Sequence, residues 1–168
     1  MPKKIPLNFE KYKKEASKSC FICDIVNGGE KREKHTIFHE DENFICFLNN
    51  YPTQEAQTLV CPKKHLCHIF ADTDEETYRQ LMDLARKTGL AIQKVTGANR
   101  MYLASLGSNQ VNSHIHIHIL PISSNLGYEQ QQLAAFDHNN GVYQYTKKER
   151  QLLANLIKKE MNRKTTLR

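Results

Sequence analysis

The sequence predicts an α+β fold built on a mostly antiparallel sheet of five strands, with one long helix and a C-terminal helix. Three observations lead to this prediction. Short runs of β-forming residues fall into two groups, a long segment with helical periodicity separates these groups, and a second periodic segment follows them. Strands grouped before and after a helix are typical of α+β domains, whereas strict alternation of strands and helices would indicate a parallel sheet.

The length of 168 residues corresponds to one domain. A hydrophobic content of 39% and a charged content of 25% exclude collagen-like, mucin-like and largely disordered chains. No apolar run reaches the roughly 18 residues of a membrane span, and the first residues lack the apolar segment of a secretory signal. We therefore expect no membrane span and a cytoplasmic location.

The five expected strands are short runs rich in β-branched and aromatic residues, and Pro62 and Pro121 close two of them. The strands cover residues 36–39, 44–48, 58–61, 100–105 and 113–120. The lysine-rich residues 1–19 contain no such run, so they are expected to form a loosely attached arm.

Two capping boxes mark where the helices are expected to begin. Thr73-Asp-Glu-Glu76 opens a segment whose apolar residues recur at helical spacing as far as Gly97, a residue that often ends a helix. Thr146-Lys-Lys-Glu149 opens the second helix. Its apolar residues lie on one side: Leu152, Leu153, Leu156 and Ile157.

The strongest chemical feature is the alternating run Ser113-His-Ile-His-Ile-His-Ile-Leu-Pro121. On a strand, alternation puts His114, His116 and His118 on one face and the isoleucines on the other. The isoleucine face belongs to the core. The histidine face is expected to line a polar site, because three adjacent titratable rings are costly to bury. A merely histidine-rich exposed face is the weaker alternative.

The spacing of these histidines argues against one metal ion bound by all three. A strand rises about 3.3 Å per residue, so the outer Cα atoms lie about 13 Å apart, whereas a Zn–N bond is about 2.1 Å. One outer histidine is expected to join a metal site while the next acts chemically. Cys20, Cys23 and His65 with that histidine would form a closed, structural Cys₂His₂ site; two packed, reduced cysteines are the alternative. Spacing assigns no role to Cys46, Cys61, Cys67, His35, His39, His68 and His138.

The histidine run resembles the motif of the histidine triad (HIT) family of nucleotide hydrolases and transferases. The resemblance covers most of residues 20–121, including Cys20-Phe-Ile-Cys23, which is similar to the zinc-binding opening of many bacterial members. Phe47-Leu-Asn-Asn-Tyr-Pro52 resembles a segment that contacts the nucleoside, and Leu59-Val-Cys-Pro-Lys-Lys-His65 is similar to another family motif. The implied organisation is a lysine-rich arm over residues 1–19, a HIT domain over residues 20–122 and a C-terminal extension over residues 123–168.

The resemblance implies a mechanism. His116 would attack the α-phosphate of a nucleotide conjugate, either a phosphoramidate or a dinucleoside polyphosphate, and form a nucleotidyl-histidine that water or a second acceptor resolves. An imidazole with a pKa of about 6.5 is largely neutral in the cell, and covalent catalysis splits one difficult displacement into two steps. His118 and Gln110 would stabilise charge on the phosphate, and Asn49 would hold the ribose hydroxyls.

The resemblance also implies partners. Zinc would be structural and no organic cofactor is expected. The implied zinc ligands are Cys20, Cys23, His65 and His114. The family usually pairs its sheets, so a homodimer is expected.

Four residues depart from the family pattern. Ala56 and Gln57 stand where the family often has Gly-His, and Asn109 and Val111 flank Gln110 where it commonly has glycine and a small hydroxyl residue. These changes concern leaving-group contacts, so a catalytically weak nucleotide-sensing or partner-binding protein on the same scaffold is the main alternative. A metal-dependent hydrolase is a third. A nucleic-acid-binding zinc module is the weakest, because a second CxxC is missing.

The formal net charge of +6 belongs to the two ends of the chain. Residues 1–19 carry six Lys/Arg and two acids, and residues 147–168 carry eight and two, whereas residues 20–146 carry ten and fourteen. Phosphate binding must therefore come from particular groups at the histidine site, and no specific nucleic-acid partner is expected. Deleting residues 1–19 is expected to leave turnover unchanged.

Overall fold

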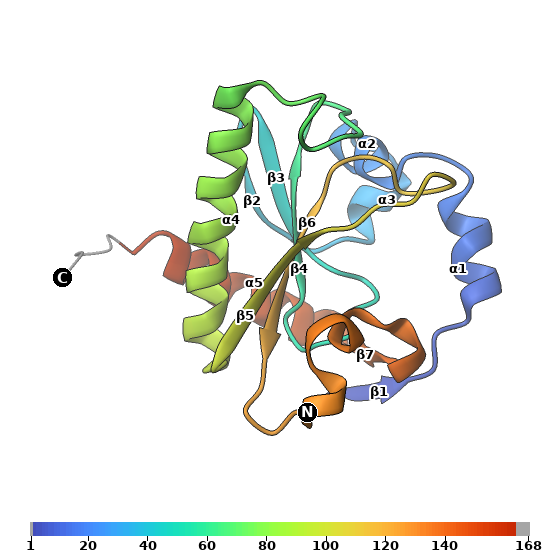
Figure 1. The fold of residues 1–168 in the computed structure, drawn as a ribbon. Coiled ribbons are helices and arrows are strands. Elements are labelled where there is room, and N and C mark those ends of the chain that lie inside the picture. Colours follow the sequence, from blue (N-terminus) through green and yellow to red (C-terminus); the bar gives the residue numbers. More distant parts are fainter. Residues whose placement is uncertain (1, 164–168) are drawn as a thin grey trace.

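The computed structural model describes residues 2–163 and is built around a five-stranded antiparallel sheet (Figure 1). The strands are β2 (Ile37–Glu40), β3 (Phe44–Leu48), β4 (Thr58–Pro62), β5 (Arg100–Ser105) and β6 (Ile117–Ile122). Their order in the sheet is β2-β3-β4-β6-β5, and all neighbours are antiparallel. The α+β class and the five-stranded sheet predicted from the sequence are confirmed.

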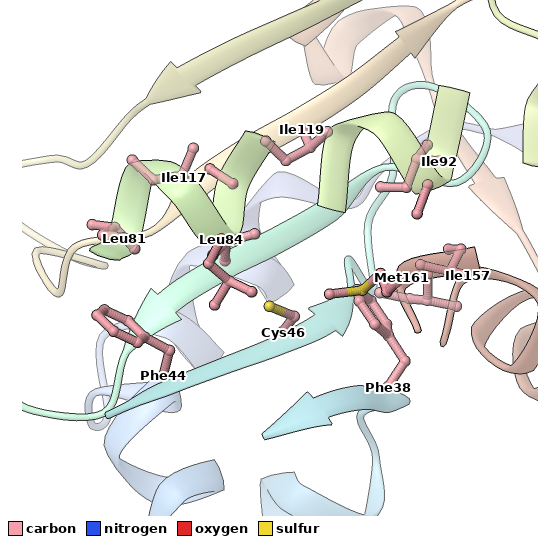
Figure 2. Packing of buried hydrophobic residues seen from close by; sticks show 14 of the residues in the cluster. Phe38, Phe44, Cys46, Leu81, Leu84, Ile92, Ile117, Ile119, Ile157 and Met161 are labelled. Carbon is pink, nitrogen blue, oxygen red and sulfur yellow. The ribbon is translucent and has the colours of Figure 1, made fainter. Parts of the chain in front are cut away.

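Two long helices, α4 (Glu75–Thr96) and α5 (Lys147–Met161), share one hydrophobic core with the sheet. Figure 2 shows this core from close by, with side chains of both helices packed on side chains of the strands. The labelled residues are Phe38, Phe44, Cys46, Leu81, Leu84, Ile92, Ile117, Ile119, Ile157 and Met161. Both predicted helices are therefore present and pack on the same face of the sheet. Of the apolar side predicted for α5, Ile157 is buried, whereas Leu152 and Leu156 are exposed.

One of the two predicted capping boxes is present, and the other helix begins with a different cap. At α5 the Thr146 box is present, because the Glu149 N–H donates to Thr146 Oγ1 and the Thr146 N–H donates to Glu149 Oε2. At α4 the cap is Asp74, one residue later than predicted, and its carboxylate accepts from the Thr77 N–H at 2.7 Å. The hydroxyl of Thr73 instead donates to the Ile69 carbonyl of the preceding loop.

The strand that carries the triad is shorter than predicted. β6 begins at Ile117, because the chain before it leaves β4: the Ile115 N–H donates to the Leu66 carbonyl of a loop at 2.7 Å. The division into two faces still holds, because the isoleucines at 115, 117 and 119 lie in the core beneath α4. His114 and His116 therefore sit on the segment that leads into the strand, and only His118 lies within it.

Residues 2–19 contain one strand and one helix. β1 (Lys3–Ile5) pairs with β7 (Val142–Gln144) in a separate two-stranded sheet, and α1 (Phe9–Ala16) follows it. Figure 1 shows α1 on the far side of the sheet from α4. The sequence analysis missed β1 and α1 because they are only three and eight residues long and none of their residues is buried.

The remaining elements are short. They are α2 (Phe21–Val26), α3 (Glu30–Glu33) and the 3₁₀ turns η1 (Tyr128–Gln130), η2 (Gln132–Phe136) and η3 (His138–Asn140). α2 covers the sheet face opposite α4, where Ile22 and Ile25 pack with Phe47 and Leu59. Among residues 2–163, no helix combines the length and the apolar character that a membrane span requires.

Candidate active site

A cavity of about 720 Å³ opens beside α2, and both His116 and His118 line it. This volume lies within the range of about 300–1,000 Å³ that small-molecule sites occupy. The walls come from segments far apart in the sequence: α1, α2, the turn after β3, the loop between β5 and β6, and η2–η3. The cavity therefore joins the triad to both segments outside the predicted domain.

His116 is a buried ring whose proton is placed by the backbone. Its Nδ1 lies 2.7 Å from the carbonyl oxygen of His114, and because a carbonyl only accepts, Nδ1 carries the proton and Nε2 carries a lone pair. Burial lowers the pKa of His116 below the usual value. The ring packs edge-on against Phe21, with centroids 6.3 Å apart. This is a neutral imidazole beside a cavity, and its Nε2 has no hydrogen-bond partner among the residues that the structure describes.

His118 follows two residues later, with its ring centroid 4.9 Å from that of His116. Burial, and then the neighbouring His116 and His138, lower the pKa of His118 to about 3. Its Nδ1 lies 3.1 Å from the side-chain nitrogen of Gln57, a residue that departs from the family pattern. His118 is thus neutral at any physiological pH.

The other predicted nucleotide ligands differ in their placement. Asn49 lines the cavity, and its Oδ1 accepts from the Tyr51 N–H at 2.9 Å, which leaves the amide nitrogen for other partners. Gln110 is exposed and lies outside the lining residues. Its neighbours Val111 and Asn112 line the cavity instead.

The four predicted metal ligands lie together although they are distant in sequence. The Sγ and ring-nitrogen atoms of Cys20, Cys23, His65 and His114 are all within 4.8 Å of one another. The Nε2–H of His114 donates to the Pro62 carbonyl at 2.9 Å, so its Nδ1 lone pair faces Cys20 Sγ at 3.3 Å. His65 Nδ1 lies 3.1 Å from Cys23 Sγ.

These residues fit a zinc ion. Two thiols and two imidazole lone pairs make the Cys₂His₂ donor set that zinc binds in closed structural sites, and the bond from His114 to Pro62 is the kind of outer contact that orients a ligand histidine. Burial and the neighbouring Cys20 raise the pKa of the Cys23 thiol to about 11. A cation would therefore be needed to keep the Cys23 sulfur as a thiolate at neutral pH.

Sequence analysis missed several residues of the cavity wall. His35 stacks near Phe21 at 6.0 Å, and its Nδ1–H donates to the Lys31 carbonyl at 2.6 Å. His138 lies next to Tyr12 of α1, with ring centroids 6.2 Å apart and planes 27° apart. No spacing rule could have found them, because each reaches the cavity from a separate segment.

The profile of the HIT domain matches residues 30–125. The chain belongs to the HIT family. An uncharacterized HIT-like protein of Mycoplasma genitalium is 34% identical over 111 residues, which cover 64% of this chain and 76% of that relative. A HIT-family relative from Xenopus tropicalis, named adenosine 5′-monophosphoramidase HINT3, is 28% identical over 113 residues, which cover 66% of this chain and 72% of its own.

Solved structures of HIT proteins share the fold. A hypothetical histidine triad nucleotide-binding protein from Sulfolobus tokodaii has a TM-score of 0.66 at 27% identity, covering 84% of this chain and 91% of its own. A Zn-bound histidine triad family protein from Mycobacterium smegmatis has a TM-score of 0.66 at 23% identity, and the match covers 86% of this chain and 94% of that protein. The segments outside residues 30–125 include α1 and η3, which complete the cavity of this HIT protein.

Proposed function

We propose that this HIT protein is a nucleotidyl-transferring hydrolase or transferase acting on a nucleotide conjugate. His116 Nε2 attacks the α-phosphorus, a phosphorus–nitrogen bond forms, and the bond to the leaving group breaks with its electron pair. Water or a second acceptor then attacks the same phosphorus and releases neutral His116. Two displacements thus replace one difficult step.

The observation that carries this proposal is the protonation state of His116. The ring donates Nδ1–H to the His114 carbonyl, so its lone pair is on Nε2. The lowered pKa keeps that lone pair unprotonated at neutral pH. A buried neutral imidazole beside a cavity of about 720 Å³ is suited to attack an electrophilic phosphorus.

The substrate we propose is a nucleoside phosphoramidate, with a dinucleoside polyphosphate as the other member of the same class. Two relatives, from Xenopus tropicalis and Danio rerio, are named adenosine 5′-monophosphoramidase and are 28% and 30% identical to this chain. In this assignment Asn49 holds the ribose and His118 stabilises charge on the phosphate, whereas Gln110, which lies outside the cavity lining, would have to move to do the same.

Zinc completes the proposal as a structural ion. Cys20, Cys23, His65 and His114 would hold it, and its chemistry would be to tie the start of α2 to the segment before β6. No organic cofactor enters the proposed reaction.

We place the protein in the cytoplasm as a homodimer. None of the five cysteines forms a disulfide, which fits a reducing compartment. β5 forms an edge of the five-stranded sheet, with Leu103 exposed, and an edge of this kind offers unpaired backbone groups to a second copy.

A catalytically weak nucleotide-sensing or partner-binding protein is the second candidate. The observation that favours it is the position of Gln110, which is exposed and outside the cavity lining. Tight nucleotide binding without turnover across a panel of conjugates would support this candidate over the first.

The deciding experiment is mass spectrometry of the intact protein mixed with adenosine phosphoramidate. We expect a transient adenylyl adduct on wild type, none on His116→Asn, and a loss of turnover of at least about 10³-fold in that variant. His39→Asn is the matched control, because His39 lies on β2 outside the cavity lining. Full turnover in a folded His116→Asn protein would overturn the proposal.

A further inference from the structure

Gln57 is a buried glutamine, 2% exposed, in the tight turn that leads into β4. The Thr53 N–H donates to Gln57 Oε1 at 2.7 Å. A backbone N–H only donates, so the oxygen of the amide must face Thr53 and its NH₂ group must face the opposite way. The orientation of this amide is therefore fixed by the chain itself.

The turn around Gln57 is held by the C-terminal segment. The Thr53 hydroxyl donates to the Ala135 carbonyl at 2.7 Å, and the Ala56 N–H donates to the Tyr145 hydroxyl at 3.0 Å. Ala56 has a left-handed φ of 58°, a conformation that costs energy for a residue with a side chain. Contacts from distant residues thus maintain a strained turn that presents Gln57.

The NH₂ group of Gln57 meets the ring of His118. Gln57 Nε2 lies 3.1 Å from His118 Nδ1. The amide nitrogen has no lone pair to offer, so it donates and Nδ1 accepts, and the single proton of the neutral ring must be on Nε2. Within residues 2–163, Nε2 has no hydrogen-bond partner, and no fully buried side-chain nitrogen lacks one, so Nε2 is open to the cavity that His118 lines.

We propose that Gln57 is a positioning residue that holds His118 as the neutral Nε2–H tautomer, a fixed hydrogen-bond donor to the phosphate of the substrate. The identity of the acceptor, the substrate phosphate, rests on the proposed function. The tautomer of His118 does not depend on that function. His118 then acts neither as general acid nor as general base, because its only proton is on a neutral nitrogen and its other nitrogen is occupied.

The surroundings of His118 support this assignment. The titratable groups that face it are His116 and His138, the edge of Phe136 packs against it at 6.2 Å, and no carboxylate among the described residues bonds to it. Protonating Nδ1 would set an N–H against the NH₂ of Gln57, so two donors would meet without an acceptor. The proton for the leaving group must therefore come from another source.

The test is ¹⁵N NMR of the full-length protein labelled at its histidines, with His118→Gln used to assign the signals. We expect His118 in wild type to show a protonated Nε2 and a bare Nδ1 throughout pH 5–8. Gln57→Glu keeps the oxygen that faces Thr53 and places a second oxygen beside Nδ1. That variant should move a proton to Nδ1 and raise the pKa of His118.

Kinetics provide the second readout. Gln57→Glu should lower kcat by about 10- to 100-fold with KM little changed, and should add a pH dependence near neutrality that wild type lacks. Gln144→Glu is the control, because it adds the same charge at an exposed position of β7. A mixed or Nδ1–H tautomer in wild type, or an unchanged tautomer and pH profile in Gln57→Glu, would overturn the proposal. The NMR result needs no substrate, so it stands apart from a failure of the proposed reaction.

Discussion

At the scale of single residues, each triad histidine contacts a different group through one ring nitrogen. His114 donates Nε2–H to Pro62, His116 donates Nδ1–H to His114, and His118 accepts at Nδ1 from Gln57. The second ring nitrogen therefore differs among the three. In His114 it carries a lone pair that faces the cysteines, in His116 it carries the lone pair of the proposed nucleophile, and in His118 it carries an N–H that is open to the cavity. Three identical side chains thus acquire two different tautomers and three different sets of contacts from their neighbours.

The first residue-scale prediction concerns stability against pH. Burial lowers the pKa of His118 to about 3 in the folded protein, whereas an unfolded histidine titrates near about 6.5. Below pH 6.5 the unfolded chain binds more protons, so the free energy of unfolding should fall as the pH falls toward 3. His118→Gln should reduce this slope by up to about 1.4 kcal/mol per pH unit. Urea unfolding of both proteins between pH 5 and 7.5 measures this slope. Equal slopes of the free energy of unfolding against pH in wild type and His118→Gln would contradict the prediction.

The second residue-scale prediction concerns Asn49. If its amide nitrogen holds a ribose hydroxyl, Asn49→Ala should raise KM by roughly 2- to 13-fold, the value of one neutral hydrogen bond. Wild type should lose the same factor on the 2′-deoxy or 3′-deoxy conjugate that lacks the bonded hydroxyl. Asn49→Ala should show the same KM for the deoxy conjugate and for the conjugate that retains the hydroxyl. Equal discrimination by both proteins would rule out this contact.

The residues that sequence could identify are those with fixed local spacing. Cys20 and Cys23 are three residues apart on the start of one helix, and the triad follows strand alternation. His35, His138 and Tyr12 have no such relation to the site, because only the tertiary fold brings them to the cavity. Gln57 was visible as a departure from the family pattern, but its bond to His118 depends on a turn with positive φ that no sequence rule predicts.

At the scale of elements, α1 changes the expected role of the N-terminal segment. Tyr12 lines the cavity, and its hydroxyl accepts from Asn112 Nδ2 at 2.8 Å, so the helix is fixed to the loop that precedes the triad. Glu15 of the same helix accepts from the Tyr51 hydroxyl. The expectation that residues 1–19 do not matter for turnover no longer follows.

The element-scale prediction is that α1 contributes to substrate binding. Tyr12→Ala should raise KM by roughly 5- to 10-fold, because it removes an aromatic wall worth about 1–1.4 kcal/mol. Lys14→Ala, an exposed change on the same helix outside the cavity lining, should leave KM unchanged. Steady-state kinetics of both variants measure this effect. Equal KM values would show that substrate does not reach α1.

At the scale of the whole molecule, the Cys₂His₂ cluster connects segments from opposite parts of the chain. Cys20 caps α2, whose Phe21 packs against His116, while His114 lies two residues before that ring. An ion held there would have two effects at once: it would stabilise the fold and fix the position of one wall of the cavity. This is why we expect metal loss to affect stability and not chemistry alone.

The metal prediction follows from that arrangement. Cys23→Ser should lose bound zinc and lower Tm by roughly 5–16 °C, the effect of an ion present at about 100 to 1,000 times its Kd. His68→Asn is the control, because His68 is exposed and is not one of the four clustered ligands. Elemental analysis and calorimetry measure both effects. Metal loss that abolishes turnover without any change in Tm would favour a catalytic metal instead.

The second whole-molecule prediction concerns assembly. Light scattering should give twice the chain mass of 19.5 kDa for wild type. Leu103→Glu on the edge strand β5 should give the single mass, whereas Leu133→Glu, at an exposed position of η2, should not change it. A monomeric wild type would exclude the homodimer.

The pairing of β1 with β7 has a consequence for synthesis. Lys3 lies opposite Gln144, so β1 finds its partner only after all the residues between the two strands have left the ribosome. Contacts of such long sequence separation form late, and a three-residue ladder with exposed side chains opens early. We therefore expect the cavity wall that α1 provides to form last during folding and to unfold first under heat or denaturant.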